Sequence, residues 1–169
     1  MEMDEIIEFV AALDGVLTLK PQPGDGSPEL AWGDAFFYYA PDGVVPRTQP
    51  FATIVTKDYP GDESSHLSRP DTFRVNFFAG KDAFQNWTGR TPRDPAPHDA
   101  DASATDTVMA HPVYGSQGWL AVVNPGVRTE TAVRELLRAA HDLARSRWHR
   151  RAANDQPAPD QPVPDQRGS

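Results

Sequence analysis

The sequence contains no cysteine. That absence excludes disulfide bonds, thiolate zinc sites and a cysteine nucleophile. The chain also lacks the stretch of about 18 consecutive apolar residues that a membrane-spanning helix needs. Its first residues, MEMDEIIEFVAALDG, are acidic and have neither the basic nor the apolar region of a signal peptide. These features predict a cytoplasmic protein that does not enter a membrane.

Positive charge is scarce. The chain has 16 Lys and Arg residues against 24 Asp and Glu residues, which gives a net charge of −8 at pH 7. Such a charge repels polyanions at long range and disfavours general binding of nucleic acid. The 169 residues suffice for one domain with its own buried core. Hydrophobic residues make up 38%, a low share that reflects 17 prolines and a polar C-terminal segment.

Motifs for catalysis and cofactor binding are missing as well. The sequence has no GxSxG nucleophile elbow, and Gly80-Lys81 is not preceded by a glycine-rich phosphate loop. The five histidines do not have the HxxxH or HExxH spacing of a helical metal site; they are His66, His98, His111, His141 and His149. The sequence therefore predicts no metal and no cofactor, and leaves open only a metal site assembled from distant residues.

Hydrophobic periodicity predicts a helix near each end of the chain. The first would begin after an N-cap at Asp4 and end at Gly15, with apolar residues at helical spacing. The last would run from about Glu130 to Arg150 after an N-cap at Thr129, and its buried stripe would be Val133, Leu136, Leu137, Ala140 and Ala144. A short third helix is expected over Lys81–Thr88.

Strand-like segments occupy the region between these helices. They cover residues 16–20, 29–32, 35–40, 51–57, 72–78, 107–110 and 118–123. Gly33-Asp34 would form the turn of a hairpin. The pattern predicts an α+β fold in which the N- and C-terminal helices pack on one face of an antiparallel sheet. This single domain would cover residues 1–151, and the Pro/Asp/Gln-rich segment 152–169 would be disordered.

Several phrases of the sequence resemble known families. LDGV after the first helix, FRVNF before the short helix and Trp119 in the penultimate strand resemble the MmcQ/YjbR-like proteins. WGDAFFYYAPDG, FATIVTKDYPGD and HPVYGSQGWLAVVNP look like an uncharacterised actinobacterial domain-of-unknown-function family, over about residues 1–150. The resemblance implies a CyaY-like α+β fold, and proposed roles of MmcQ/YjbR-like proteins include binding of DNA or of antibiotics. The lysine that commonly follows the FRVNF strand is absent here, which weakens the expectation of an anion-binding or DNA-binding role from this resemblance.

Aromatic and polar residues lie on or beside the predicted strands. If the helices cover one face of the sheet, residues on the other face would line an open surface suited to a small molecule. This set is Trp32, Tyr38, Arg74, Asn76, His111, Tyr114 and Trp119. Arg74 would offer charge or a bidentate hydrogen bond, Asn76 and His111 would orient the ligand, and the aromatic rings would stack on it. Alternatively, the aromatic residues belong to the core and Arg74 pairs with an acidic neighbour.

The sequence thus favours a non-catalytic protein that binds a small organic ligand, such as a metabolite or an antibiotic-like molecule. One alternative is a DNA-binding module that uses a basic stripe on the last helix: Arg134, Arg138, His141 and Arg145. The simpler interpretation of that stripe is a solvated face, because exposed charged stripes are ordinary on amphipathic helices. Another alternative is a small enzyme with His111 as acid or base, assisted by Asp58 or Tyr114. Asp58, Asp62 and Glu63 are expected in a solvated loop. The sequence does not indicate an oligomeric state.

Overall fold

The computed structural model describes residues 1–155, which form one antiparallel sheet and three α-helices. The six strands lie in the order β1-β2-β3-β4-β6-β5, and each neighbouring pair is antiparallel. The strands are β1 (Val16–Leu19), β2 (Ala35–Tyr39), β3 (Ala52–Val55), β4 (Arg74–Phe77), β5 (Met109–Ala110) and β6 (Leu120–Val123). The predicted α+β fold with an antiparallel sheet is confirmed.

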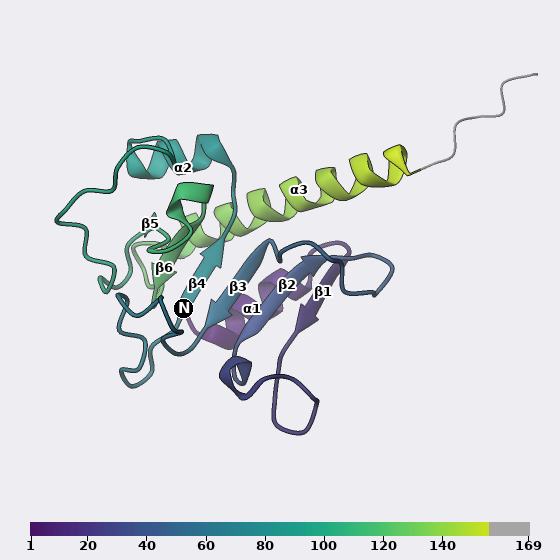
Figure 1. Ribbon diagram of the computed structural model, residues 1–169, viewed down its shortest axis with the longest axis horizontal. Helices are drawn as coiled ribbons and strands as arrows, with labels where there is room; N and C mark the ends of the chain where they lie inside the picture. The colour runs from purple at the N-terminus through teal and green to yellow at the C-terminus, as the bar shows by residue number, and fades with distance from the viewer. Residues whose placement is uncertain (156–169) are drawn as a thin grey trace, which may run out of the picture.

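The helices are α1 (Met3–Ala11), α2 (Lys81–Thr88) and α3 (Glu130–Asn154). Figure 1 shows α1 and α3 behind the sheet, and α3 continuing beyond the strands. All three contribute to one hydrophobic core, for example through Ile6, Phe84 and Leu137, each fully buried. Within residues 1–155, no helix is both long enough and apolar enough to cross a membrane.

Strand alternation decides which side chains face the helices. On β2, Ala35, Phe37 and Tyr39 are buried, whereas Phe36 and Tyr38 point to the other face and are half-buried. On β4, Val75 and Phe77 belong to the core that packs against the helices. Arg74 and Asn76 alternate with them and must point to the opposite face, because successive side chains of a strand alternate in direction. That helix-free face is where the polar residues of the domain gather.

The segment before β2 differs from its prediction. Residues Glu29–Ala31 form a 3₁₀ turn and not a strand, so Gly33-Asp34 does not close a hairpin. Gly33 has a φ of +86°, which turns the chain into β2. The Asp34 carboxylate, 1% exposed, then accepts hydrogen bonds from the Thr56 N–H and hydroxyl, both at 2.8 Å. These contacts fix the start of β2 against the end of β3. Strand β1 pairs with β2, although residues 20–34 separate the two strands in the sequence.

The ends of the first and last helices also differ from their predicted positions. The N-cap of α1 is Glu2, which forms a capping box with Glu5, so Asp4 lies inside the first turn. The helix ends at Ala11, before Gly15. At the other end of the chain α3 continues to Asn154, so residues 152–154 are helical and do not belong to a disordered tail. The rest of the predicted tail, residues 156–169, lies outside the described residues.

Asp106 secures the start of α3. Thr129 occupies the N-cap position as predicted, but its hydroxyl donates to Asp106 at 2.6 Å and makes no capping bond. The Asp106 carboxylate also accepts the N–H groups of Gly126, Arg128 and Thr129. Partial burial opposes ionisation of Asp106, but these hydrogen bonds outweigh it and lower the pKa of the carboxyl group. The carboxylate of Asp106, a residue that precedes β5 in the chain, thus takes the place of a capping side chain from the helix itself.

Asp106→Asn should destabilise the protein by about 1 kcal/mol, since the amide accepts fewer hydrogen bonds and carries no charge for the helix N-terminus. Asparagine tolerates the positive φ of 51° at this position, so backbone strain is not introduced. Chemical denaturation at pH 7 gives the free energy of unfolding. The exposed Asp99 in the same loop supplies the control, Asp99→Asn. Equal stabilities for both variants would contradict the capping role.

Candidate functional site

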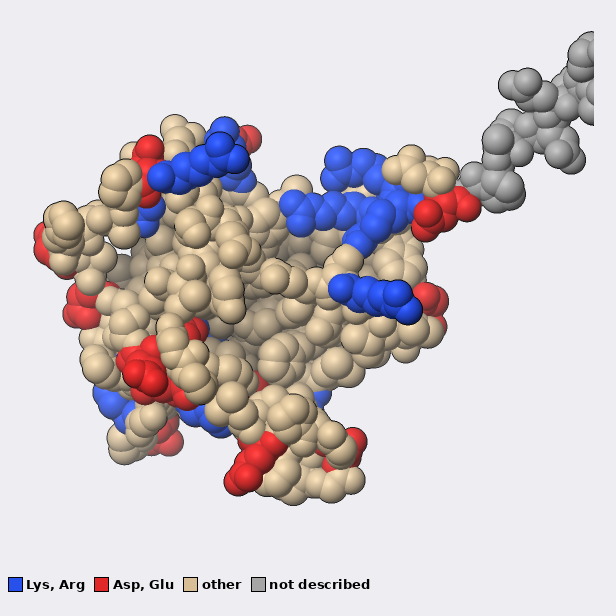
Figure 2. Space-filling view, in the orientation of Figure 1, with Lys and Arg blue, Asp and Glu red and all other residues tan. Residues whose placement is uncertain are grey.

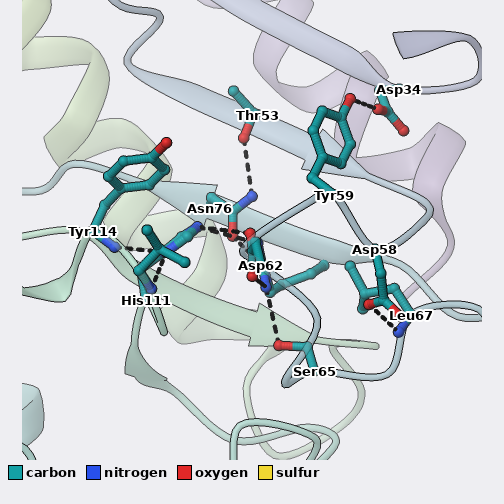
Figure 3. Close-up of polar contacts among 12 residues, drawn as sticks. Asp34, Thr53, Asp58, Tyr59, Asp62, Ser65, Leu67, Asn76, His111 and Tyr114 are labelled. Atoms are coloured by element: carbon teal, nitrogen blue, oxygen red, sulfur yellow. Dashed lines mark hydrogen bonds and ion pairs between the residues drawn. The ribbon is translucent and has the colours of Figure 1, made fainter. Parts of the chain in front are cut away.

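Arg74 lies at the centre of the helix-free face and is only 1% exposed. Its guanidinium donates to both carboxylate oxygens of Asp62, at 3.0 and 2.5 Å, and to the Ser65 hydroxyl at 3.0 Å. Its Nε donates to Asn76 Oδ1 at 2.8 Å. The remaining N–H, on Nη2, points at His111 Nε2, 3.1 Å away. Figure 3 shows Asp62, Ser65, Asn76 and His111 grouped in this way, so the cation is held by the protein itself.

Asp62 and Ser65 come from the connector between β3 and β4, residues 58–71. This connector folds over the sheet: Leu67 is 1% exposed and packs with Val55 and Val123. Asp58 holds the bend by accepting the Leu67 N–H at 2.9 Å. The prediction of a solvated loop is therefore wrong for Asp62, whose side chain is 16% exposed. The connector covers part of the face that was expected to be open.

The ion pair sets the charge state of Asp62. Burial works against ionisation, but the hydrogen bonds and the charge of Arg74 prevail and hold the pKa of Asp62 below its ordinary value. The carboxylate is therefore ionised at neutral pH, and the pair carries no net charge. A buried guanidinium without such a partner would be strongly unfavourable.

His111 is neutral, and the contacts of its ring define which nitrogen carries the proton. Nδ1 accepts the backbone N–H groups of Val113 and Tyr114, both at 3.0 Å, so the proton lies on Nε2. Burial, together with the charge of Arg74, lowers the pKa of His111 to about 3, although Asp62 opposes the shift. Nε2 lies 3.9 Å from Asp62 Oδ2, too far for a hydrogen bond.

One N–H of Arg74 and the N–H of His111 therefore face each other, and neither accepts a hydrogen bond from the other. The Nε2–H of His111 and one Nη2–H of Arg74 approach each other at 3.1 Å, and both residues line the same pocket. A ligand oxygen placed beside them would accept from both. This pair of donors is the most distinctive chemical feature of the face.

The pocket has a volume of about 460 Å³. Its polar side is formed by Thr53, Asp62, Arg74, Asn76 and His111, and its aromatic walls are Phe36, Tyr59, Tyr114 and Trp119. Asn76 Nδ2 donates to the Thr53 hydroxyl at 3.0 Å, which joins β4 to β3 across the pocket. Tyr59 is held by a short hydrogen bond from its hydroxyl to Asp34. The lining is thus fixed by one contact within the pocket and by one contact to Asp34, which lies outside it.

Five of the seven predicted site residues line this pocket: Arg74, Asn76, His111, Tyr114 and Trp119. Tyr38 lies in an adjoining groove that also includes Trp119. Trp32 lines neither cavity; its carbonyl accepts a hydrogen bond from Lys57 at 2.6 Å. The structure thus brings together predicted residues of β4 and of the segment between β5 and β6, but not Trp32.

The predicted role of Arg74 needs correction. The guanidinium already makes a bidentate contact with Asp62, so it has no second pair of N–H groups for a ligand. Both polar atoms of the Asn76 amide are also used, since Oδ1 accepts from Arg74 Nε and Nδ2 donates to the Thr53 hydroxyl. Their joint effect is to fix Asp62 and His111 at the pocket wall. Of the alternative interpretation, the structure shows the part in which Arg74 pairs with an acidic neighbour, whereas Tyr114 is 45% exposed and does not belong to the core.

Sequence reasoning missed Thr53, Phe36 and the inward position of Asp62. A signal for Asp62 was present, because a buried arginine in a central strand requires a carboxylate and the preceding connector contains four. Thr53 is the register partner of Asn76, a pairing that becomes visible only when β3 and β4 are aligned. Phe36 follows from the alternation of β2 once the helices are placed.

A family model described as a family of unknown function, DUF6194, matches residues 1–153. The chain belongs to the DUF6194 family. The matched region contains the sheet, the pocket and all but the last residue of α3. Comparisons with curated proteins and with solved structures find no match. For this DUF6194 protein, the geometry of the pocket is therefore the basis for any statement about function.

Asp62→Asn should destabilise the protein by about 3 kcal/mol at pH 7, since it leaves a buried guanidinium without its counter-charge. The adjacent, exposed Glu63 provides a matched control, Glu63→Gln. Because the pKa of Asp62 is lower in the folded state, its contribution is present above the unfolded pKa of about 3.9 and is lost as the pH falls through the folded value. Urea denaturation between pH 7 and pH 3 should show that acid-sensitive component in Glu63→Gln and not in Asp62→Asn.

His111 should remain neutral through the range in which an ordinary histidine titrates, with its pKa of about 3 in place of about 6.5. Its ring resonances in NMR spectra, assigned by comparison with His111→Gln, should not shift between pH 8 and pH 5. The unfolded chain binds a proton near pH 6.5 and the folded chain does not, so this residue reduces stability as the pH falls below that value. A midpoint near 6.5 in the folded protein would refute the assignment.

Proposed function

We propose that this DUF6194 protein binds a small organic ligand in the pocket on the helix-free face of its sheet and catalyses no reaction on it. The observation that supports this function best is the combination of aromatic walls with a few fixed polar groups in one cavity of about 460 Å³. Small-molecule sites are typically concave, mostly apolar and of a few hundred Å³, with a small number of polar groups that fix orientation.

The polar groups favour a ligand that carries an oxygen acceptor at one end. Such an oxygen would accept from His111 Nε2–H and Arg74 Nη2–H, where the two donors now oppose each other. The Thr53 hydroxyl lies on the same side of the pocket. Phe36, Tyr114 and Trp119 offer rings for a flat or apolar body. A carbonyl or carboxylate attached to an aromatic or aliphatic body fits these requirements.

The alternative of a small enzyme is less well supported. A general base needs a free lone pair and a pKa near the working pH. In His111 the Nδ1 lone pair accepts two backbone N–H groups, and the pKa is about 3. Asp58 is engaged with the Leu67 backbone. Tyr114 lies beside the imidazole, with 5.0 Å between ring centroids, as a wall of the pocket.

We propose the same class of ligand that the sequence favours, a metabolite or an antibiotic-like molecule. The resemblance to MmcQ/YjbR-like proteins and their CyaY-like fold is consistent with it, since ligand binding has been suggested for some of them. The proposal also keeps the predicted actinobacterial origin and cytoplasmic location.

Native mass spectrometry of the protein purified gently from its own host tests this function. We expect an added mass that disappears on denaturation and can then be identified. Tyr114→Ala, at the rim of the pocket, should reduce the bound fraction and weaken affinity for the identified ligand by about tenfold, the loss expected for one stacking ring. Trp87→Ala is the control because Trp87 is similarly exposed, 47% against 45%, and lies outside the pocket. Equal retention by the two variants would contradict the proposed site.

A further inference from the structure

A second cavity of about 530 Å³ lies between the C-terminal half of α3 and the end of the sheet. One wall is α3, with Leu143, Ala144 and three arginines; the other is the β2–β3 loop, with Pro46 and Pro50. Figure 2 shows basic side chains gathered over this part of α3, beside a hollow in the surface. We call this cavity the arginine groove.

The arginine groove is positively charged, whereas the protein as a whole has a negative net charge. Its lining includes Arg147, Arg150 and Arg151 and no acidic residue. None of these three arginines forms an ion pair within residues 1–155, whereas Arg134 pairs with both Glu5 and Glu130. In a chain with a net charge of −8, three cations on one concave surface that form no ion pair with residues 1–155 create a local attraction for anions.

Aromatic rings line the same groove. The Arg147 guanidinium lies over the Phe78 ring at 4.7 Å from its centroid, and Phe78 contacts Trp119 with 6.0 Å between ring centroids. Tyr38 completes this wall. Arginine held against an aromatic face keeps its planar fork of N–H groups pre-organised for a carboxylate, sulfonate or phosphate.

The arginine groove and the pocket on the sheet are adjacent. Gln49, Pro50 and Trp119 line both cavities. One ligand that contacts the Trp119 indole can therefore extend from the pocket, where the His111 donor pair lies, into the arginine groove. The two ends differ in character, since one presents two buried N–H donors and the other presents full positive charges near solvent.

We infer that the ligand of this protein is an organic anion with an aromatic or other flat body, and that Arg147, Arg150 and Arg151 bind its charged group. This inference rests on the proposed function, because it assigns the charge of the ligand that occupies the pocket. The body lies along Trp119, Phe78 and Tyr38, and an oxygen at the far end accepts from His111.

The same contacts argue against duplex DNA as the partner of α3. The predicted basic stripe is not available as a whole: Arg134 is paired, Arg138 stacks on Phe9 at 5.0 Å, and His141 is 5% exposed with Nε2 2.6 Å from the Asp14 carbonyl. Of these three residues, His141 is buried and Arg134 is already paired, whereas Arg138 stays exposed. The remaining arginines that line the groove lie on a concave, aromatic surface, which suits a small anion better than a double helix.

The test uses two fluorescent probes that share one scaffold: 1-anilinonaphthalene-8-sulfonate, an anion, and N-phenyl-1-naphthylamine, which lacks the sulfonate. Wild-type protein at low ionic strength should bind the sulfonate at least about tenfold more tightly, the value of one charge-assisted hydrogen bond. The double variant Arg147→Gln/Arg150→Gln should lose that preference and bind both probes alike. Arg145→Gln, an exposed arginine of the same helix outside the groove, should behave as wild type.

Each contrary result has a distinct meaning. Equal affinity of wild type for the two probes would overturn this inference and leave the proposed function standing. Failure of both probes to bind would overturn both. Tight binding of a short DNA duplex that Arg145→Gln weakens as much as the double variant would also overturn the inference, in favour of a nucleic-acid surface. Thermal denaturation of each variant confirms that the fold is retained.

Discussion

Burial of the Arg74 guanidinium is the constraint on which the rest of the helix-free face depends. A cation that is 1% exposed in the middle of a sheet requires a counter-charge and acceptors for its N–H groups. Asp62 supplies the charge, and it can do so only if the 58–71 connector folds over the sheet. That fold places Leu67 on Val55 and Val123 and leaves the pocket between the connector and Trp119. The ion pair thus shapes the cavity and leaves one Arg74 N–H, on Nη2, beside His111 at its wall.

The two faces of the sheet have different roles. The face against α1 and α3 is filled by apolar side chains and provides most of the burial that stabilises the domain. The other face combines a neutral ion pair, a neutral histidine and aromatic rings, which are suited to selective contacts. Because α3 extends past the strands, its last turns bring arginines to the end of this second face (Figure 1). One long helix therefore serves the core with its first half and the arginine groove with its second.

The sequence predicted those strands and helices whose residue pattern follows from burial of one face. Alternation identified β2 and β4, and helical spacing identified α1 and α3, because each pattern reflects burial against one neighbour. Asp62 could not be placed, since its position depends on a contact with Arg74 that forms only after β3 and β4 pair. A strand was predicted over residues 29–32, but Glu29–Ala31 form a 3₁₀ turn, and the start of β2 is fixed by the contact of Asp34 with Thr56, which is distant in sequence. His141 lies four residues after Leu137 and so on the buried stripe, but its polarity suggested an exposed position.

A crystallographic fragment screen is the decisive measurement for the pocket, because it locates binding without knowledge of the natural ligand. Crystals of the full chain would be soaked with a library of small aromatic acids and their uncharged amides. We expect bound fragments along Trp119, with an oxygen within hydrogen-bond distance of His111 Nε2 and Arg74 Nη2 or a carboxylate against the α3 arginines. Fragments that gather elsewhere, or a pocket closed by its own side chains, would contradict that expectation.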